Sequence, residues 1–164
     1  HFPNIIRMTK VSAYKDNWRE LIDNSKRVLG HIDIMWVSDL DDITLYEKGV
    51  KIYKELKNEF PLLGITTENP TLAFKFINQF PECRFFMLSV YIGMDNCTRV
   101  FIDYAKKSYR YTFAIKTFLD GELLKRYSVK SCSEFVKNVN PDVVVIGTVN
   151  SIHLKEVIGY YEEF

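Results

Sequence analysis

The fold is decided by the stretch IDIMWVSDLDDITLYEKGVKIYKELKNEFPLLGIT, residues 32–66. Its two ends, residues 32–37 and 62–66, are short apolar runs that predict strands. The segment between them, residues 45–60, is predicted to be a helix. It places four apolar side chains at helical spacing: Val50, Tyr53, Leu56 and Phe60. A strand, a helix and a second strand in this order predict a βαβ unit with parallel strands.

The same alternation continues on both sides of this unit. Further strands are predicted at residues 5–10, 85–91, 111–118 and 143–146. Further helices are predicted from Asp16 or Asn17 to Leu29, from Asn69 onward, over residues 98–107, from Ser131 or Ser133 to Val139, and over residues 152–161. Gly30 is expected to end the first helix, and Pro70 to lie in the first turn of the helix that Asn69 caps. The chain therefore predicts six βα units.

Two parallel α/β architectures fit this pattern: part of a β/α barrel and a doubly wound open sheet. The 164 residues suit one domain, and no break in the pattern divides residues 1–164. A closed eight-unit barrel needs about 250 residues, so the chain is too short for a complete one. A doubly wound nucleotide fold usually has a glycine-rich first turn. The first predicted turn, Lys10-Val11-Ser12-Ala13, contains no glycine.

The composition of the chain limits the binding partners and the cellular compartment that we expect for it. The chain has 22 basic and 21 acidic residues, a net charge of +1, so neither nucleic acid nor an anionic membrane is an expected partner. No apolar run reaches membrane-spanning length. The cysteines are odd in number and spaced like no metal site: Cys83, Cys97 and Cys132. We expect a reduced cytoplasmic protein without a metal. Because the chain opens with His1 instead of methionine, we also expect a processed product or a fragment of a longer chain.

Functional groups of parallel α/β folds gather where the strands end. Lys10 and Lys116 are predicted at such ends, where a lysine faces either a cleft or solvent, and desolvation lowers its pKa in the first case. Asp33 lies within a predicted strand, and a structural hydrogen bond is its expected role. An acidic cluster follows the same strand: Asp39, Asp41 and Asp42. It is suited to a divalent cation or, as we expect, to a solvated loop that caps a helix.

Four stretches together resemble the aldo/keto reductases, in register over essentially the whole chain. They are residues 32–38, residues 63–67, residues 114–124, and residues 145–148 with 153–156. The resemblance implies a β/α barrel that reduces a small-molecule carbonyl substrate with NADPH. The six predicted strands correspond to the third through eighth of that barrel. The first two units, which carry the family's catalytic aspartate and tyrosine, are absent from this sequence.

The resemblance also assigns roles to individual residues. Lys10 falls on the family's catalytic lysine, whose charge lowers the pKa of the tyrosine that donates the proton. Ser38 replaces the family's histidine and cannot carry its charge. Thr66 and Thr67 replace a Ser-Asn pair at the nicotinamide, Ser89 or Leu88 replaces a glutamine, and Ile115 replaces a stacking aromatic ring. The remaining positions expected at the cofactor are Lys116, Gly147, Thr148, Lys155 and Glu156.

These assignments leave three hypotheses. In the first, the chain keeps the scaffold and a weakened NADPH groove, and catalysis is impaired or absent. In the second, it is part of an active NADP-dependent reductase whose aspartate and tyrosine lie upstream. In the third, it is a non-catalytic interaction or regulatory protein. A second copy or another chain would then cover the strand edges expected at residues 5–10 and 143–146.

Overall fold

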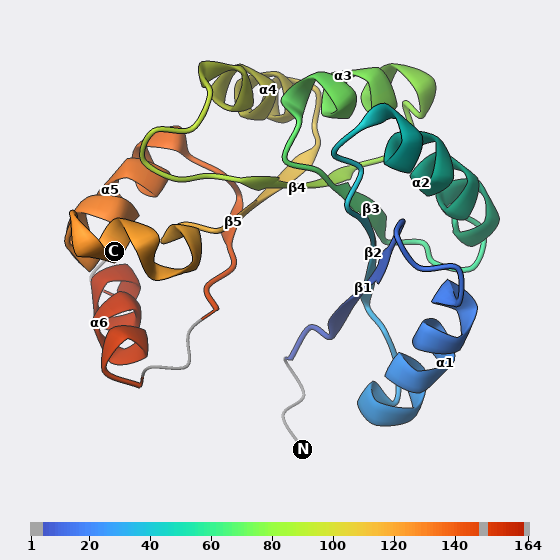
Figure 1. Ribbon diagram of the computed structural model, residues 1–164, viewed down its shortest axis with the longest axis horizontal. Coiled ribbons are helices and arrows are strands. Elements are labelled where there is room, and N and C mark those ends of the chain that lie inside the picture. The colour runs from blue at the N-terminus through green and yellow to red at the C-terminus, as the bar shows by residue number, and fades with distance from the viewer. Residues whose placement is uncertain (1–4, 148–150, 163–164) are drawn as a thin grey trace. The chain divides into compact units, whose positions relative to one another are not determined.

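The computed structural model describes residues 5–147 and 151–162. Within these ranges, parallel strands alternate with helices along the chain (Figure 1). The chain divides into two compact units, the first comprising residues 1–87 and the second residues 88–164. The predicted series of six βα units is therefore confirmed.

The first unit contains a parallel sheet in which each strand pairs with the next one along the chain. Its strands are β1 (Met8–Ser12), β2 (Ile34–Ser38), β3 (Leu63–Thr66) and the start of β4 (Phe85–Ser89), which crosses the boundary between the units. Its helices are α1 (Trp18–Leu29), α2 (Ile43–Leu56) and α3 (Pro70–Gln79). All five residues of β2 are buried, as expected for a strand that is covered on both faces.

Local sequence signals set the helix ends of this unit. Gly30 adopts a positive φ of 78° and its N–H donates to the Lys26 carbonyl at 2.8 Å, so it ends α1 as predicted. The side chain of Asn69 accepts a hydrogen bond from the Thr71 N–H at 3.0 Å, and Pro70 follows in the first turn of α3. Both predicted helix ends are confirmed.

Aromatic side chains fill the space between α2, α3 and the sheet. The ring of Phe76 is fully buried and meets the edge of Tyr53 with the two centroids 4.9 Å apart. Phe80 lies 4.7 Å from Phe76 and 5.0 Å from Tyr53, again between ring centroids. Each such pair adds about 0.5–1.5 kcal/mol beyond the area that it buries. This cluster therefore holds both helices against the strands.

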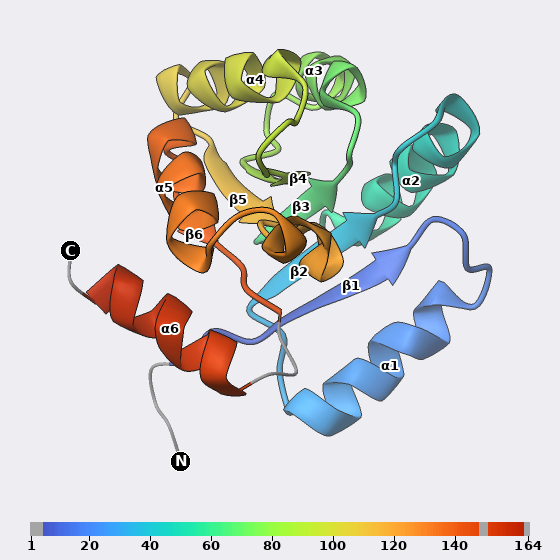
Figure 2. The same cartoon turned by 60° about the vertical axis from the view of Figure 1, so that its left-hand side comes forward.

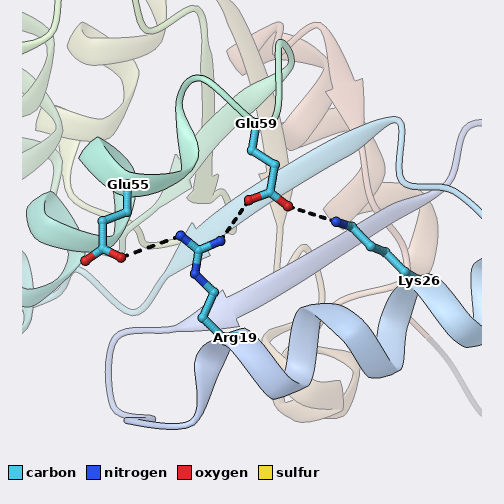
Figure 3. A network of polar contacts seen from close by, with 4 residues as sticks. All are labelled: Arg19, Lys26, Glu55 and Glu59. Carbon is cyan, nitrogen blue, oxygen red and sulfur yellow. Dashed lines mark hydrogen bonds and ion pairs between the residues drawn. The ribbon is translucent and has the colours of Figure 1, made fainter.

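An ion-pair network joins α1 to the end of α2 and to the turn that follows it (Figure 3). Glu59 accepts hydrogen bonds from Arg19 Nη1 and Lys26 Nζ, each at 2.8 Å, and Arg19 also reaches Glu55 at 3.5 Å. The hydrogen bond from Lys26 is the main reason that the pKa of Glu59 lies below its ordinary value. The network therefore stabilises the fold above the carboxyl's ordinary pKa, and this contribution is lost as the pH falls through the lowered one. Because the side chains are partly exposed, each pair contributes only about 0.2–1 kcal/mol.

The second unit is built in the same way. It contains the end of β4, β5 (Tyr111–Ile115), β6 (Val143–Val144), α4 (Asn96–Lys107), the 3₁₀ segment η1 (Leu119–Lys125), α5 (Val129–Val139) and α6 (Ser151–Glu162). The Val90 N–H, just after β4, donates to the Ile115 carbonyl at 2.9 Å. Strands β5 and β6 are parallel, with Phe113 opposite Val143. Figure 2 shows α5 and α6 from a second side.

Several predicted element boundaries differ from the observed ones, and three of these differences concern α5, β5 and β6 of the second unit. Helix α5 begins after Ser128, whose side chain accepts from the Ser131 N–H at 3.0 Å, and not at Ser131 or Ser133. Strand β5 ends at Ile115 because Lys116 takes a positive φ of 57° that turns the chain into η1. Strand β6 spans two residues instead of four, and in the part of the chain that the structure describes it pairs only with β5. All three errors concern where an element begins or ends.

In each unit, an aspartate with the same hydrogen-bond pattern precedes a strand. In the first unit, Asp33 Oδ2 accepts the Arg7 N–H at 2.7 Å, while the Asp33 N–H donates to the Arg7 carbonyl at 2.8 Å. In the second unit, Asp142 Oδ2 accepts the Thr112 N–H at 2.7 Å, and the Asp142 N–H donates to the Thr112 carbonyl at 2.9 Å. Each carboxylate completes the pairing between two neighbouring strands. The structural role predicted for Asp33 is therefore confirmed.

Candidate functional site

Lys10 lies in the middle of β1, opposite Trp36, and not at the end of the strand as predicted. The reason is that β1 continues to Ser12, two residues beyond the predicted end. The neighbouring Val11 is buried, and Thr9 Oγ1 lies 3.1 Å from Ser25 Oγ of α1. Because successive strand residues face opposite sides of a sheet, Lys10 points away from α1. It is exposed on that side.

Ser38 lies at the carboxyl end of β2 and is buried. Its hydroxyl group lies within hydrogen-bond distance of two internal acceptors, the Val11 carbonyl at 3.2 Å and Asp39 Oδ2 at 2.9 Å. A serine hydroxyl has one proton to donate. That proton is therefore already used in a hydrogen bond within the protein.

Thr66 and Thr67 follow each other at the end of β3, and both are buried. The Thr67 hydroxyl donates to the Leu40 carbonyl at 2.7 Å and accepts the Asn69 N–H at 3.0 Å. The Leu40 N–H in turn donates to the Thr66 carbonyl at 3.3 Å. These bonds join the loops that come after β2 and β3. Thr67 thus connects the ends of β2 and β3, and its hydroxyl already donates one hydrogen bond and accepts another.

The carboxylates of the acidic cluster after β2 accept hydrogen bonds from neighbouring groups of the protein. Asp42 caps α2 by accepting the Leu45 N–H at 2.9 Å. Asp41 accepts the Glu68 N–H at 2.6 Å, and Asp39 accepts the Ser38 hydroxyl. The expected role in capping a helix is therefore confirmed. In the part of the chain that the structure describes, no group of three His, Cys, Asp or Glu residues is placed to hold a metal ion.

Ser89 is the candidate in the second unit with an unused polar atom. It ends β4 and is buried, and its hydroxyl has no hydrogen-bond partner within residues 5–147 and 151–162. Thr117, two residues after β5, also has a buried hydroxyl that forms no hydrogen bond with the described residues. The bond between Val90 and Ile115 holds the ends of β4 and β5 side by side. Thr117 was not among the predicted site residues, since its type and spacing carry no distinctive signal.

The other predicted cofactor positions of the second unit differ in residue type and in exposure to solvent. Lys116 is half-buried at the turn after β5. Gly147 is exposed, and a Cβ built on it would meet no atom of the described residues within 4 Å. Lys155 and Glu156 are exposed on α6. Thr148 lies outside the described residues.

One of the buried cysteines, Cys132, is not an activated nucleophile. Cys83 and Cys132 are buried free thiols, and Cys97 is exposed. Burial raises the pKa of the Cys132 thiol, so the thiol stays protonated and unreactive at neutral pH. No helix in the described ranges is both long enough and apolar enough to span a bilayer.

No protein-family model matches the chain, and no curated protein does. Among solved structures, the chain is similar to an aldo/keto reductase from Klebsiella pneumoniae in complex with NADP and acetate, with a TM-score of 0.66 and 12% sequence identity. The match covers 95% of this chain but only 64% of that one, so the chain spans about two thirds of the length of that reductase. The predicted resemblance in fold is thereby confirmed. This chain has the parallel α/β fold of an aldo/keto reductase over six βα units.

Proposed function

We propose that this chain is an aldo/keto reductase-like scaffold that binds NADPH weakly and does not reduce carbonyl compounds by itself. The observation that carries the proposal is the Ser38 hydroxyl at the end of β2. Its single proton is shared between the Val11 carbonyl and Asp39. A substrate carbonyl at this position would have to break one of these internal bonds to receive a hydrogen bond. The position that the resemblance assigns to a catalytic histidine is therefore occupied by a buried structural group.

Lys10 supports the same conclusion. A catalytic lysine lowers the pKa of a neighbouring tyrosine most strongly in a site from which water is excluded. Lys10 is exposed in the middle of β1, where solvent screens its charge. Even beside a tyrosine supplied by another segment, it would promote proton donation less than a desolvated lysine.

The residues fit a dinucleotide in part. When bound, NADPH supplies the hydride that reduces a carbonyl carbon. Ser89 fits the nicotinamide carboxamide because its buried hydroxyl has no partner among the residues that the structure describes. Thr67 does not fit, since its hydroxyl already bonds the Leu40 carbonyl. Lys116 and Lys155 supply positive charge suited to phosphate groups. This mixed set of groups supports weak binding.

We expect NADPH to bind saturably, with a Kd between about 10 μM and 1 mM, when its fluorescence is titrated with the whole chain. Ser89→Ala is expected to weaken NADPH binding and, in the absence of NADPH, to leave the free energy of unfolding unchanged or raise it by up to about 1 kcal/mol. The stability gain is expected because alanine removes a buried hydroxyl that has no partner in the described part of the chain.

The matched control is Ser133→Ala on α5, which also removes a buried serine hydroxyl. It should leave NADPH binding unchanged. Saturation absent below about 1 mM would remove cofactor use from the proposal. Reduction of a panel of aldehydes at a rate typical of enzymes, about 1 s⁻¹ or faster, would contradict the loss of catalysis.

A second candidate function, that of a non-catalytic interaction protein, is favoured by the edge of β1. In the described part of the chain, β1 pairs with β2 alone. The apolar side chains of Ile6, two residues before this strand, and of Met8, its first residue, are 65% and 37% exposed. An exposed apolar strand edge favours pairing with another chain. The occupant in this proposal is a second copy or a different protein.

Sedimentation velocity at about 100 μM, above the Kd of a micromolar self-association, is expected to show a species larger than one chain. Met8→Lys should shift it toward the monomer because a charged side chain disfavours edge pairing. Val28→Lys is the control, since Val28 is an exposed apolar residue on α1. A single monomeric boundary for the unsubstituted protein would contradict self-pairing.

A further inference from the structure

Two serines of the sequence follow a pair of basic residues, and they lie at opposite ends of two helices in the second unit. Ser128 follows a lysine and an arginine at positions 125 and 126, and Ser108 follows two lysines at positions 106 and 107. Ser108 is the C-cap of α4, whereas Ser128 is the N-cap of α5. Protein kinases select their substrates partly by such patterns of charge. The surroundings of each serine then decide which one is suited to phosphorylation.

The Ser108 hydroxyl is already used inside the protein. Ser108 is half-buried, and its hydroxyl donates to the Tyr104 carbonyl at 2.7 Å. The last carbonyl groups of α4 point toward this position, which is the negative end of the helix dipole. A phosphate at Ser108 would break the existing bond and would be repelled by these carbonyls. Ser108 is therefore poorly suited to carry a phosphate.

Ser128 lies in different surroundings. It is exposed, and residues 126–128 belong neither to η1 nor to α5. Its backbone is extended, with a φ of −72° and a ψ of 159°. Its side-chain oxygen accepts the Ser131 N–H at 3.0 Å and lies 2.9 Å from the hydroxyl of Ser131, which is also exposed. Ser128 is therefore accessible to an enzyme from solvent.

The two basic residues before Ser128 face solvent as well. Arg126 is exposed, and its side chain forms no ion pair or hydrogen bond with the described residues. The side chain of Lys125 is 69% exposed and pairs with Glu122 at 2.8 Å. An exposed pair of this kind contributes little to stability, so Lys125 exchanges Glu122 for another carboxylate at small cost. Both cations are therefore available to an acidic recognition surface.

We infer that Ser128 is phosphorylated by a serine kinase that selects basic residues before its acceptor. The Ser128 oxygen forms a bond to the γ-phosphorus of ATP, and the bond from that phosphorus to the β,γ-bridging oxygen breaks. ADP leaves, and the hydroxyl proton passes to the aspartate base of the kinase. The phosphate carries a charge of about −1.5 to −2 at pH 7 and stabilises α5, whose N-terminus is the positive end of its dipole. This inference does not depend on the proposed function.

The test treats the whole chain with ATP and the catalytic subunit of cyclic-AMP-dependent protein kinase, a kinase that selects basic residues before a serine. Mass spectrometry of the digested chain then locates the phosphate. We expect phosphorylation of Ser128 at a rate at least about tenfold above that of Ser108. The phosphorylated chain should also melt about 1–4 °C above the unmodified chain, because the phosphate interacts favourably with the N-terminus of α5.

Two substitutions and a control test the recognition. Ser128→Asn keeps a helix cap but removes the hydroxyl, so the phosphate at this position should be lost. Arg126→Ala should lower the rate of phosphorylation by about tenfold or more, because the kinase loses a cationic contact. The control is Arg27→Ala, which removes an exposed arginine from α1 and should be phosphorylated as the unsubstituted chain is. Circular dichroism confirms that each variant is folded, and Arg126→Gln replaces Arg126→Ala if the latter is not.

The inference is overturned by any of four results. The kinase transfers no phosphate to Ser128 of the folded chain. Ser108 is phosphorylated as fast as Ser128. The folded variant at Arg126 is phosphorylated at the rate of the unsubstituted chain. The phosphorylated chain melts at or below the temperature of the unmodified one.

Discussion

Replacing Gly64 with alanine is expected to lower the free energy of unfolding by about 3 kcal/mol. Gly64 lies in β3 between Trp36 of β2 and Phe85 of β4. A Cβ at this position would lie 2.6 Å from Trp36 Cζ3 and 2.7 Å from both the Cβ and the carbonyl oxygen of Phe85. All three distances are shorter than atoms tolerate. Glycine is required here because the Trp36 ring packs over the backbone of β3.

The surroundings give little room for relief. Trp36 is only 2% exposed, so its ring has no solvent-filled space into which it can swing. The Phe85 carbonyl is backbone in the paired strand, so moving it disturbs the sheet. The packing cost therefore remains after relaxation.

Urea unfolding followed by tryptophan fluorescence measures this loss. The control is Gly159→Ala in α6, where a Cβ would meet no atom within 4 Å. Alanine in that helix is expected to be neutral or stabilising by up to about 1 kcal/mol. A Gly64→Ala protein within about 0.5 kcal/mol of the unsubstituted one would show that the strands do not pack this closely.

Replacing Asp142 with alanine is expected to cost about 3 kcal/mol. The carboxylate accepts both the backbone N–H and the hydroxyl of Thr112, which is 0% exposed. Without it, two donors of Thr112 at the start of β5 lose their acceptor. Loss of the partner of a buried polar group costs about 1–3 kcal/mol for each group. The weak pairing with Lys106 adds little.

Thermal unfolding compares this variant with two others. Asp142→Asn keeps an acceptor oxygen and should lose only about 1 kcal/mol, since the bond is no longer charge-assisted. Asp103→Ala removes an exposed carboxylate from α4 and should change stability by less than about 0.5 kcal/mol. If Asp142→Ala behaves as Asp103→Ala does, the carboxylate does not hold β5 and β6 together.

Sequence patterns predicted the structure correctly where it depends on interactions between residues close together in the chain. The cap formed by Asn69 and the left-handed turn at Gly30 depend on residues within one helical turn, and both were predicted correctly. The alternation of strands and helices follows from periodicity alone. The fold resemblance came from four stretches of sequence, and the solved aldo/keto reductase confirms it. Ser128 was missed as a cap because three serines within six residues offer the same local chemistry.

The place of Lys10 required the tertiary structure. Periodicity located the apolar run but not where its pairing with β2 stops, and the two additional paired residues place Lys10 in the middle of the strand. Gly64 is another example. A glycine in a predicted strand signals close approach, but only the sheet shows that the approaching group is the Trp36 ring.

The sequence by itself determined the number of βα units, their order and the candidate residues at the strand ends, because these depend on periodicity and caps over a few residues. Only the tertiary structure decided whether those residues are available for chemistry. The hydroxyls of Ser38 and Thr67 are each bonded to a carbonyl 27 positions away in the chain. Such partners depend on the pairing of neighbouring strands, which brings distant backbone groups within hydrogen-bond distance.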